Sequence, residues 1–113
     1  MRILKEKITI DELKNLSQNS FMSLVKAVVD VKKEIIAIDA ELHSDLEELL
    51  LKNGSDQYDL WGINLYPEFQ GEEFIEFDSM INLRPAQNNM TRGVESEETQ
   101  EKIKEIVYQW IKD

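Results

Sequence analysis

Apolar and polar residues alternate along four stretches of the chain, which cover residues 24–31, 35–42, 60–66 and 74–83. Alternation combined with many Val, Ile and aromatic residues is typical of β-strands that bury one side only. Lys32 and Lys33 interrupt the pattern between the first two stretches, and Pro67 and Gly71 lie between the last two. Because interruptions of this kind suit turns and short loops, the pattern predicts two β-hairpins.

Three other segments show the three-to-four-residue apolar spacing of amphipathic helices. The first runs from a capping box at Thr9 to about Gln18, the second from a capping box at Ser44 to Gly54, and the third covers residues 96–112. In each box a hydroxyl and a glutamate carboxylate satisfy backbone N–H groups at the start of the helix. Glycine after the last helical residue is a common way to end one. The boundaries of these helices are therefore predicted by local chemistry.

The predicted elements follow the order αββαββα over one domain, residues 1–113. A hairpin pairs its strands antiparallel, whereas parallel neighbours need a long crossover connection. We therefore expect an α+β fold with a mainly antiparallel, four-stranded sheet and helices packed on one face. Residues 3–7 can add a short edge strand. A chain of 113 residues, of which 42% are hydrophobic, is long enough for one such core.

Alternation also assigns side chains to the two faces of the predicted sheet. The face expected to be buried carries Val25, Ala27, Val29, Val31, Ile36, Ile38, Ala40, Leu42, Trp61, Ile63, Leu65, Ile75, Phe77, Ile81 and Leu83. The polar face carries Lys26, Asp30, Asp39, Glu41, His43, Asn64, Tyr66, Glu76, Asp78, Asn82 and Arg84. Antiparallel sheets commonly leave one face in water, so solvation alone is the simplest interpretation of this polar face.

Composition and charge exclude several classes of function. The chain has no cysteine, which excludes disulfides, thiol catalysis, cysteine-based zinc sites and iron–sulfur clusters. The sequence has no apolar run of signal-peptide or membrane-spanning length, so a cytoplasmic protein without membrane contact is expected. The net charge of −10 and the dispersed lysines disfavour nucleic acid as a partner, because phosphate binding needs clustered Lys and Arg.

Asp39, Glu41 and His43 are candidate ligands of a divalent metal, because they share one side of the second predicted strand and offer carboxylate and imidazole donors. Same-face residues of a strand lie about 7 Å apart, so only two of the three can share an ion unless the chain bends at His43. A further carboxylate would then come from Asp30, Glu76 or Asp78. The same groups can serve as a general acid/base pair if their surroundings raise one pKa. Alternatively, His43 is a turn residue that makes local hydrogen bonds before the helix.

A polar loop at residues 82–95 contains two of the three arginines in the chain. The guanidinium fork suits carboxylate or phosphate, so Arg84 and Arg92, together with Asn82 and Gln87, are candidates for binding a small anion or an acidic partner segment. The alternative is that both arginines pair with some of the 23 acidic residues and hold the loop in place.

Five segments carry a resemblance to a known family: LVKAVVDV at 24–31, IDAELH at 38–43, DLWGINLYP at 59–67, FIEFDSMINLRP at 74–85 and RGVE at 92–95. Over nearly its whole length the chain resembles a family of short, uncharacterised bacterial and archaeal proteins, a domain of unknown function. The resemblance implies a stand-alone cytoplasmic protein and assigns no activity, cofactor or catalytic residue.

Three hypotheses about function follow from the residues. The first is a binding or interaction protein that associates with itself or with another protein, since apolar contacts are offered by Tyr66, Phe69, Trp110 and Ile111. The alternative is a small hydrolase-type enzyme with acid/base groups at Asp39, Glu41, His43 and Asp78 and anion-binding groups at Asn82, Arg84, Gln87 and Arg92. The third, based on net charge alone, is the acidic partner of a basic protein, such as a toxin–antitoxin component.

Overall fold

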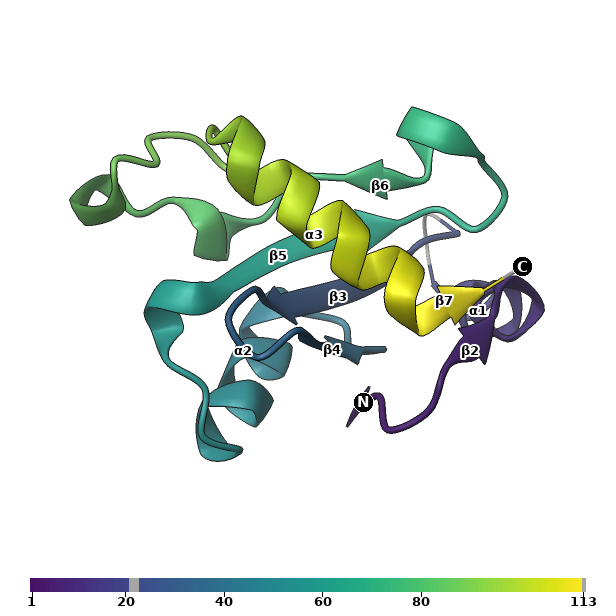
Figure 1. The fold of residues 1–113 in the computed structure, drawn as a ribbon. Helices are drawn as coiled ribbons and strands as arrows, with labels where there is room; N and C mark the ends of the chain where they lie inside the picture. Colours follow the sequence, from purple (N-terminus) through teal and green to yellow (C-terminus); the bar gives the residue numbers. More distant parts are fainter. Residues whose placement is uncertain (21–22, 113) are drawn as a thin grey trace.

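The computed structural model of the protein describes residues 1–20 and 23–112. Within these residues the central sheet has five strands in the spatial order β1-β4-β3-β5-β6, and neighbouring strands run antiparallel (Figure 1). They are β1 (Arg2–Ile3), β3 (Val25–Asp30), β4 (Ile35–Ile38), β5 (Leu60–Leu65) and β6 (Ile75–Glu76). A separate parallel pair consists of β2 (Ile8–Thr9) and β7 (Ile111–Lys112). The helices are α1 (Ile10–Ser17), α2 (His43–Lys52) and α3 (Glu97–Trp110).

The α+β class and both predicted hairpin pairings are confirmed. β3 pairs with β4 around a turn in which the Asp30 carboxylate accepts the N–H groups of Lys32 and Lys33, each at 2.9 Å. Ser55 donates a third hydrogen bond to this buried carboxylate at 2.6 Å, so Asp30 is committed to the turn. No helix in the described part of the chain is long and apolar enough to cross a bilayer.

The predicted sheet differs from the observed one at both edges. The fourth stretch, 74–83, forms a strand only over Ile75–Glu76 and then continues as loop and 3₁₀ turns. The edge strand expected at 3–7 lies instead at Arg2–Ile3, where it pairs with β4 and brings the described sheet to five strands. The four-strand count was therefore wrong, because a short N-terminal segment extends the sheet beyond β4.

The helices cover both faces of the sheet, so the prediction of helices on one face was wrong. In Figure 1, α3 crosses in front of the sheet and α2 lies behind it. Buried residues of α1 and α3 belong to one apolar cluster with Val29 and Ile63, whereas Leu46 and Leu50 of α2 pack in a second cluster with Val28. The middle of β3 is apolar on both sides, and this gives α2 a surface to bury on the face expected to be polar.

Most residues predicted for the core are buried, and the exceptions mark where the strands end. Leu42 and Leu83 are exposed, because the chain has left the sheet before it reaches either residue. Ala40 and Ile81 are only partly buried and pack against the α2 cluster rather than the cluster predicted for them. Alternation along a stretch therefore extended further than the strand itself.

Two of the three predicted helix-end signals, at Thr9 and Gly54, are confirmed. Thr9 accepts the N–H of Glu12 at 3.1 Å as the capping box requires. Gly54, with φ of +100°, ends α2 through two backbone hydrogen bonds of a Schellman motif, and Ser96 caps α3. The capping box expected at Ser44 is absent, because α2 already begins at His43 and Leu42 occupies the cap position.

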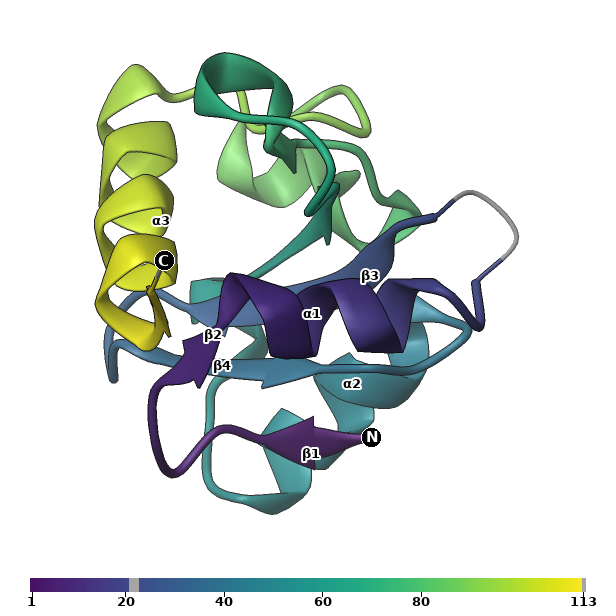
Figure 2. The same ribbon diagram turned by 90° about the vertical axis from the view of Figure 1, so that its right-hand side faces the viewer.

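The last turn predicted for α3 is instead extended. The helix ends at Trp110, and Ile111–Lys112 pairs with Ile8–Thr9 beside the start of α1. The C-terminal end of α3 therefore lies next to β2 and α1, as both views show (Figures 1 and 2).

Candidate functional site

Asp39 and Glu41 do not lie on a strand. β4 ends at Ile38, and Asp39 has a positive φ of 72°, which turns the chain out of the sheet. Both residues line a cavity of about 540 Å³ together with Lys26. The prediction that Asp39, Glu41 and His43 share one strand face was therefore wrong. Within residues 1–20 and 23–112, no three His, Asp or Glu side chains are grouped closely enough to hold a metal ion.

His43 is the first residue of α2, and its Nε2 lies 2.8 Å from the carbonyl oxygen of Ile63 on β5. A carbonyl can only accept, so Nε2 carries the proton of the neutral ring and Nδ1 carries the lone pair. Burial lowers the pKa of His43 below its ordinary value of 6.5, and Lys26 lowers it further, while the Ile63 carbonyl and Asp78 oppose the shift. The imidazole is therefore neutral at physiological pH and is held by a hydrogen bond to β5, 20 residues away in the sequence, rather than by the local hydrogen bonds that the turn interpretation expected.

Asn64 connects the end of β5 to the residues that follow it. Its Nδ2 donates to Glu76 Oε1 at 2.9 Å and to the Asp78 carbonyl at 3.2 Å, and the Tyr66 hydroxyl donates to the same Glu76 oxygen at 3.0 Å. Burial raises the pKa of Tyr66, as does Glu76, so its hydroxyl keeps its proton. Asn64 Oδ1 is buried and has no hydrogen-bond partner among the described residues.

Asn82 takes the place of a strand beside β5. Its Oδ1 accepts the Gly62 N–H at 2.8 Å, and its Nδ2 donates to the Gly62 carbonyl at 2.9 Å and to the Arg92 carbonyl at 2.9 Å. Asn82 is fully buried. Gly62 has no Cβ, which lets Ser79 approach, since a Cβ at this position would lie 2.6 Å from the Ser79 side chain. The amide thus reproduces strand pairing where the predicted fourth strand has already ended.

Arg84 is bound by backbone carbonyls on several sides. Its guanidinium donates to the carbonyls of Leu60, Gln57 and Ile81 and lies 4.6 Å over the Trp61 ring. Burial lowers the pKa of Arg84, but a guanidinium remains charged at neutral pH. Hydrogen bonds from its Nε, Nη1 and Nη2 atoms hold the segment 81–87 against the start of β5 and the turn before it.

The remaining residues of the predicted anion site also have protein partners. Gln87 accepts from Arg84 at 3.0 Å and donates to the Tyr58 carbonyl at 3.1 Å. Arg92 forms an ion pair with Asp78 at 2.8 Å, as the alternative interpretation of this loop predicted. The structure therefore brings Asp78, Asn82 and Arg92 together in one loop region, while Asp39 and Glu41 lie at a separate cavity.

Sequence reasoning overlooked Asn89, which organises the same loop. Its Nδ2 donates to the carbonyls of Asn82, Thr91 and Gly93 at 2.7–3.1 Å, and its Oδ1 accepts the N–H of Glu95 at 2.9 Å. We call residues 79–95 the polar loop. Asparagine flanked by turn residues is the signal that could have identified it, because its amide can replace missing backbone partners.

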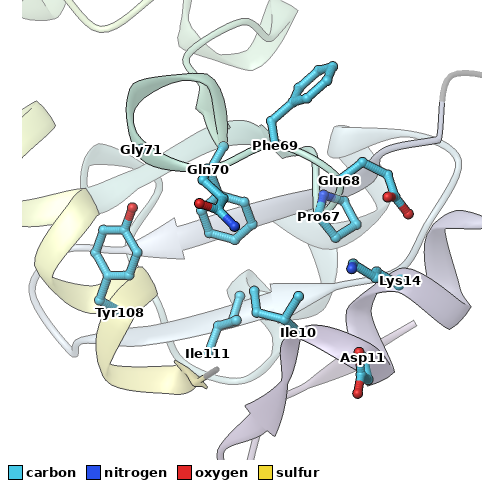
Figure 3. Close-up of a pocket in the computed structure, with 11 residues that line it drawn as sticks. Ile10, Asp11, Lys14, Pro67, Glu68, Phe69, Gln70, Gly71, Tyr108 and Ile111 are labelled. Atoms are coloured by element: carbon cyan, nitrogen blue, oxygen red, sulfur yellow. The ribbon is translucent and has the colours of Figure 1, made fainter.

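A groove of about 550 Å³ lies at the other end of the sheet, between α1, the β5–β6 connection and the end of α3 (Figure 3). It is lined by Ile10, Asp11 and Lys14 of α1, residues 67–71, Phe74, Tyr108 and Ile111. Figure 3 shows Tyr108 on one side, Lys14 with its ammonium directed inward on the other, and the Gln70 amide between them. Apolar walls with a few converging polar groups are typical of ligand pockets.

Backbone turns and aromatic pairs fix the shape of this groove. Phe69 N–H donates to the Tyr66 carbonyl at 2.9 Å, and Gly71, with φ of +65°, accepts the Phe74 N–H at 3.2 Å. Phe74 is buried and its ring centroid lies 6.1 Å from that of Tyr108, which is 54% exposed. One wall is thus anchored to the core while the facing aromatic side chain stays open to solvent.

The aromatic and apolar residues predicted for protein contact have different positions. Phe69 is 50% exposed, but its ring points away from the groove and stacks on Tyr66. Ile111 is buried, pairs with Ile8 of β2 and lines the groove, and Trp110 donates Nε1–H to the Glu34 carbonyl at 2.9 Å. Tyr108 was not predicted to take part in protein contact. It directly follows Val107 in the sequence and so lies outside the apolar stripe of α3.

The fold and groove define a small α+β domain whose antiparallel sheet is covered by helices on both faces and which has a partly apolar groove at the end of α3. The chain belongs to DUF5674, a family described as a protein of unknown function, and residues 2–110 match it. Comparison with curated proteins and with solved structures gives no match.

Proposed function

We propose that this protein is a binding module whose groove takes up a large apolar side chain from a basic segment of another protein. The observation that carries the proposal is the groove itself, about 550 Å³ in volume, whose lining includes the exposed Tyr108 together with Ile10 of α1 and Ile111. Burying one large apolar side chain contributes about 1.5–3 kcal/mol, which suits a specific but reversible contact.

Charge favours a basic partner over a second copy of the chain. Glu68 lines the groove, Glu72 and Glu73 are exposed directly after Gly71, and the whole protein carries a net charge of −10. Two copies approaching through this region would repel each other, whereas lysine or arginine beside the apolar anchor would be attracted. The proposal therefore combines the interaction hypothesis with the acidic-partner hypothesis.

A fluorescent lysine peptide that ends in phenylalanine tests the proposal by fluorescence polarisation with the full chain. We expect binding of this peptide, at least tenfold weaker binding when serine replaces the phenylalanine, and loss of about tenfold in affinity for Tyr108→Ser. The matched control is Tyr58→Ser, which removes a tyrosine that is 69% exposed elsewhere on the surface. Equal binding by both variants would rule out the groove as the binding site.

The hydrolase alternative retains one supporting observation. His43 offers a neutral Nδ1 that could accept a proton, and Asp78 is close enough to influence its pKa. Asp39 and Glu41 would not belong to such a site. Hydrolysis of p-nitrophenyl acetate by the native chain, abolished in His43→Gln and kept in Asp39→Asn, would support an enzyme built on His43, and equal rates in all three would exclude it.

A further inference from the structure

Lys14 places a positive charge in a groove lined by both apolar and polar residues. Its ammonium reaches from α1 into the groove toward Pro67, and the side chain is partly buried (Figure 3). Lys14 takes part in none of the ion pairs formed within residues 1–20 and 23–112. An ammonium partly shielded from water gains from a hydrogen-bonded anion, because charge-assisted hydrogen bonds are the strong ones.

The acidic residues beside Lys14 leave this position available. Asp11 and Glu68 also line the groove, but neither forms an ion pair with Lys14. Figure 3 shows the carboxylate of Asp11 directed away from the groove. The cation inside the groove is therefore offered to a ligand rather than to its own neighbours.

We infer that the groove recognises the free C-terminal carboxylate of its partner together with the apolar side chain of that last residue. This inference rests on the proposed function and specifies the partner segment. A C-terminal residue carries both groups on one Cα, so one residue can place its side chain against Tyr108 and its carboxylate near Lys14. Basic residues before it would face the acidic surface that follows Gly71.

Lys14 has a second role that the test must separate from ligand binding. It lies in the last turn of α1, where a positive charge interacts favourably with the helix dipole and so stabilises the helix. That role changes the stability of the helix but does not depend on the chemical form of the peptide terminus. A comparison of a free acid with its amide therefore reports on carboxylate recognition alone.

The experiment measures binding of the lysine peptide that ends in phenylalanine, as the free acid and as the C-terminal amide. The proteins are the native chain, Lys14→Met, Lys14→Arg and Lys52→Met. Lys52 is the matched control, because it is exposed on α2 and pairs with Glu48 at 3.0 Å. We expect the native chain to prefer the acid by about tenfold, as one charge-assisted contact implies. Lys14→Met should bind both forms equally, while Lys14→Arg and Lys52→Met should keep the preference.

Each other result is decisive. Equal binding of acid and amide by the native chain would overturn carboxylate recognition while leaving the groove as an apolar binding site. A preference that survives in Lys14→Met would place the carboxylate contact elsewhere and also overturn the inference. If the native chain binds neither form, the proposed function fails and this inference fails with it.

Discussion

The polar loop and the groove differ in what their side chains already contact. The polar loop carries Asn82 and Arg84, which were predicted to bind a ligand, yet both residues donate hydrogen bonds to backbone groups of the protein. Asn89 in the same loop does likewise. The groove carries fewer polar residues, and Tyr108 and the ammonium of Lys14 remain open there. A binding site therefore differs from a structural region in having side chains that are free to contact a ligand, rather than in the chemical type of its side chains.

Asn82→Ala is expected to have the largest effect on stability. The change leaves the N–H and carbonyl of Gly62 without their partners and opens a fully buried site. We expect the free energy of unfolding to fall by about 3 kcal/mol in urea titrations. Asn15→Ala on the exposed side of α1 is the control and should change stability little. A mild effect of Asn82→Ala would contradict the structural role of the polar loop.

Gly62→Ala tests how closely the polar loop approaches β5. The new Cβ would lie 2.6 Å from Cβ and Oγ of Ser79 and 3.1 Å from Ile81, so the loop has to move. Overpacking of this kind costs about 2 kcal/mol, measurable by urea denaturation. Adding Ser79→Gly should recover part of the loss, because it removes both crowded atoms. Without such recovery, the close approach would not be the cause.

Arg84→Lys and Arg92→Lys separate a buried fork from an exposed ion pair within the same loop. Lysine cannot reach the several carbonyls that Arg84 holds, so unfolding should become easier by about 1.5 kcal/mol. Arg92 pairs with Asp78 at the surface, where replacement should cost less than about 0.5 kcal/mol. Equal costs in thermal or urea unfolding would contradict the distinction drawn between these two arginines.

His43 is expected to make stability depend on pH. Its pKa is lower in the folded protein than its ordinary value of 6.5, so the unfolded chain binds the proton more readily. The contribution of neutral His43 is complete above this value and declines as the pH falls below it. Urea midpoints measured from about pH 7 to about pH 5.5 should therefore fall more in the native chain than in His43→Gln. Parallel curves would show that the imidazole is not desolvated.

Local chemistry made much of the fold predictable. Thr9 and Gly54 mark helix ends through their own hydrogen bonds or backbone angles, and both predictions are confirmed. The capping box predicted at Ser44 was wrong because the helix begins earlier, at His43. The ring of His43 there forms a hydrogen bond with the Ile63 carbonyl of β5. Such a contact depends on the position of β5, which no spacing along residues 35–54 reveals.

The candidate site was harder to predict than the fold. Whether a side chain is free to contact a ligand depends on which distant parts of the chain pack against it. The 74–83 stretch alternates like a strand in sequence, but at its end the side chain of Asn82, rather than its backbone, pairs with β5. The groove joins α1 to the β5–β6 connection and to Tyr108, which lie far apart in sequence. Alternation and helical spacing relate residues within one strand or one helix. No sequence pattern therefore predicts a groove formed by three segments that are distant in sequence.

Tyr108→Ser completes the comparison with the smallest effect on unfolding. The tyrosine is exposed over half its surface and contributes mainly a tilted contact with the Phe74 ring at 6.1 Å. We expect a change of about 0.5 kcal/mol in urea denaturation, far below that of Asn82→Ala. A loss as large as that of the buried asparagine would mean that Tyr108 supports the core, and the wall of the groove would then be structural in the same sense as the polar loop.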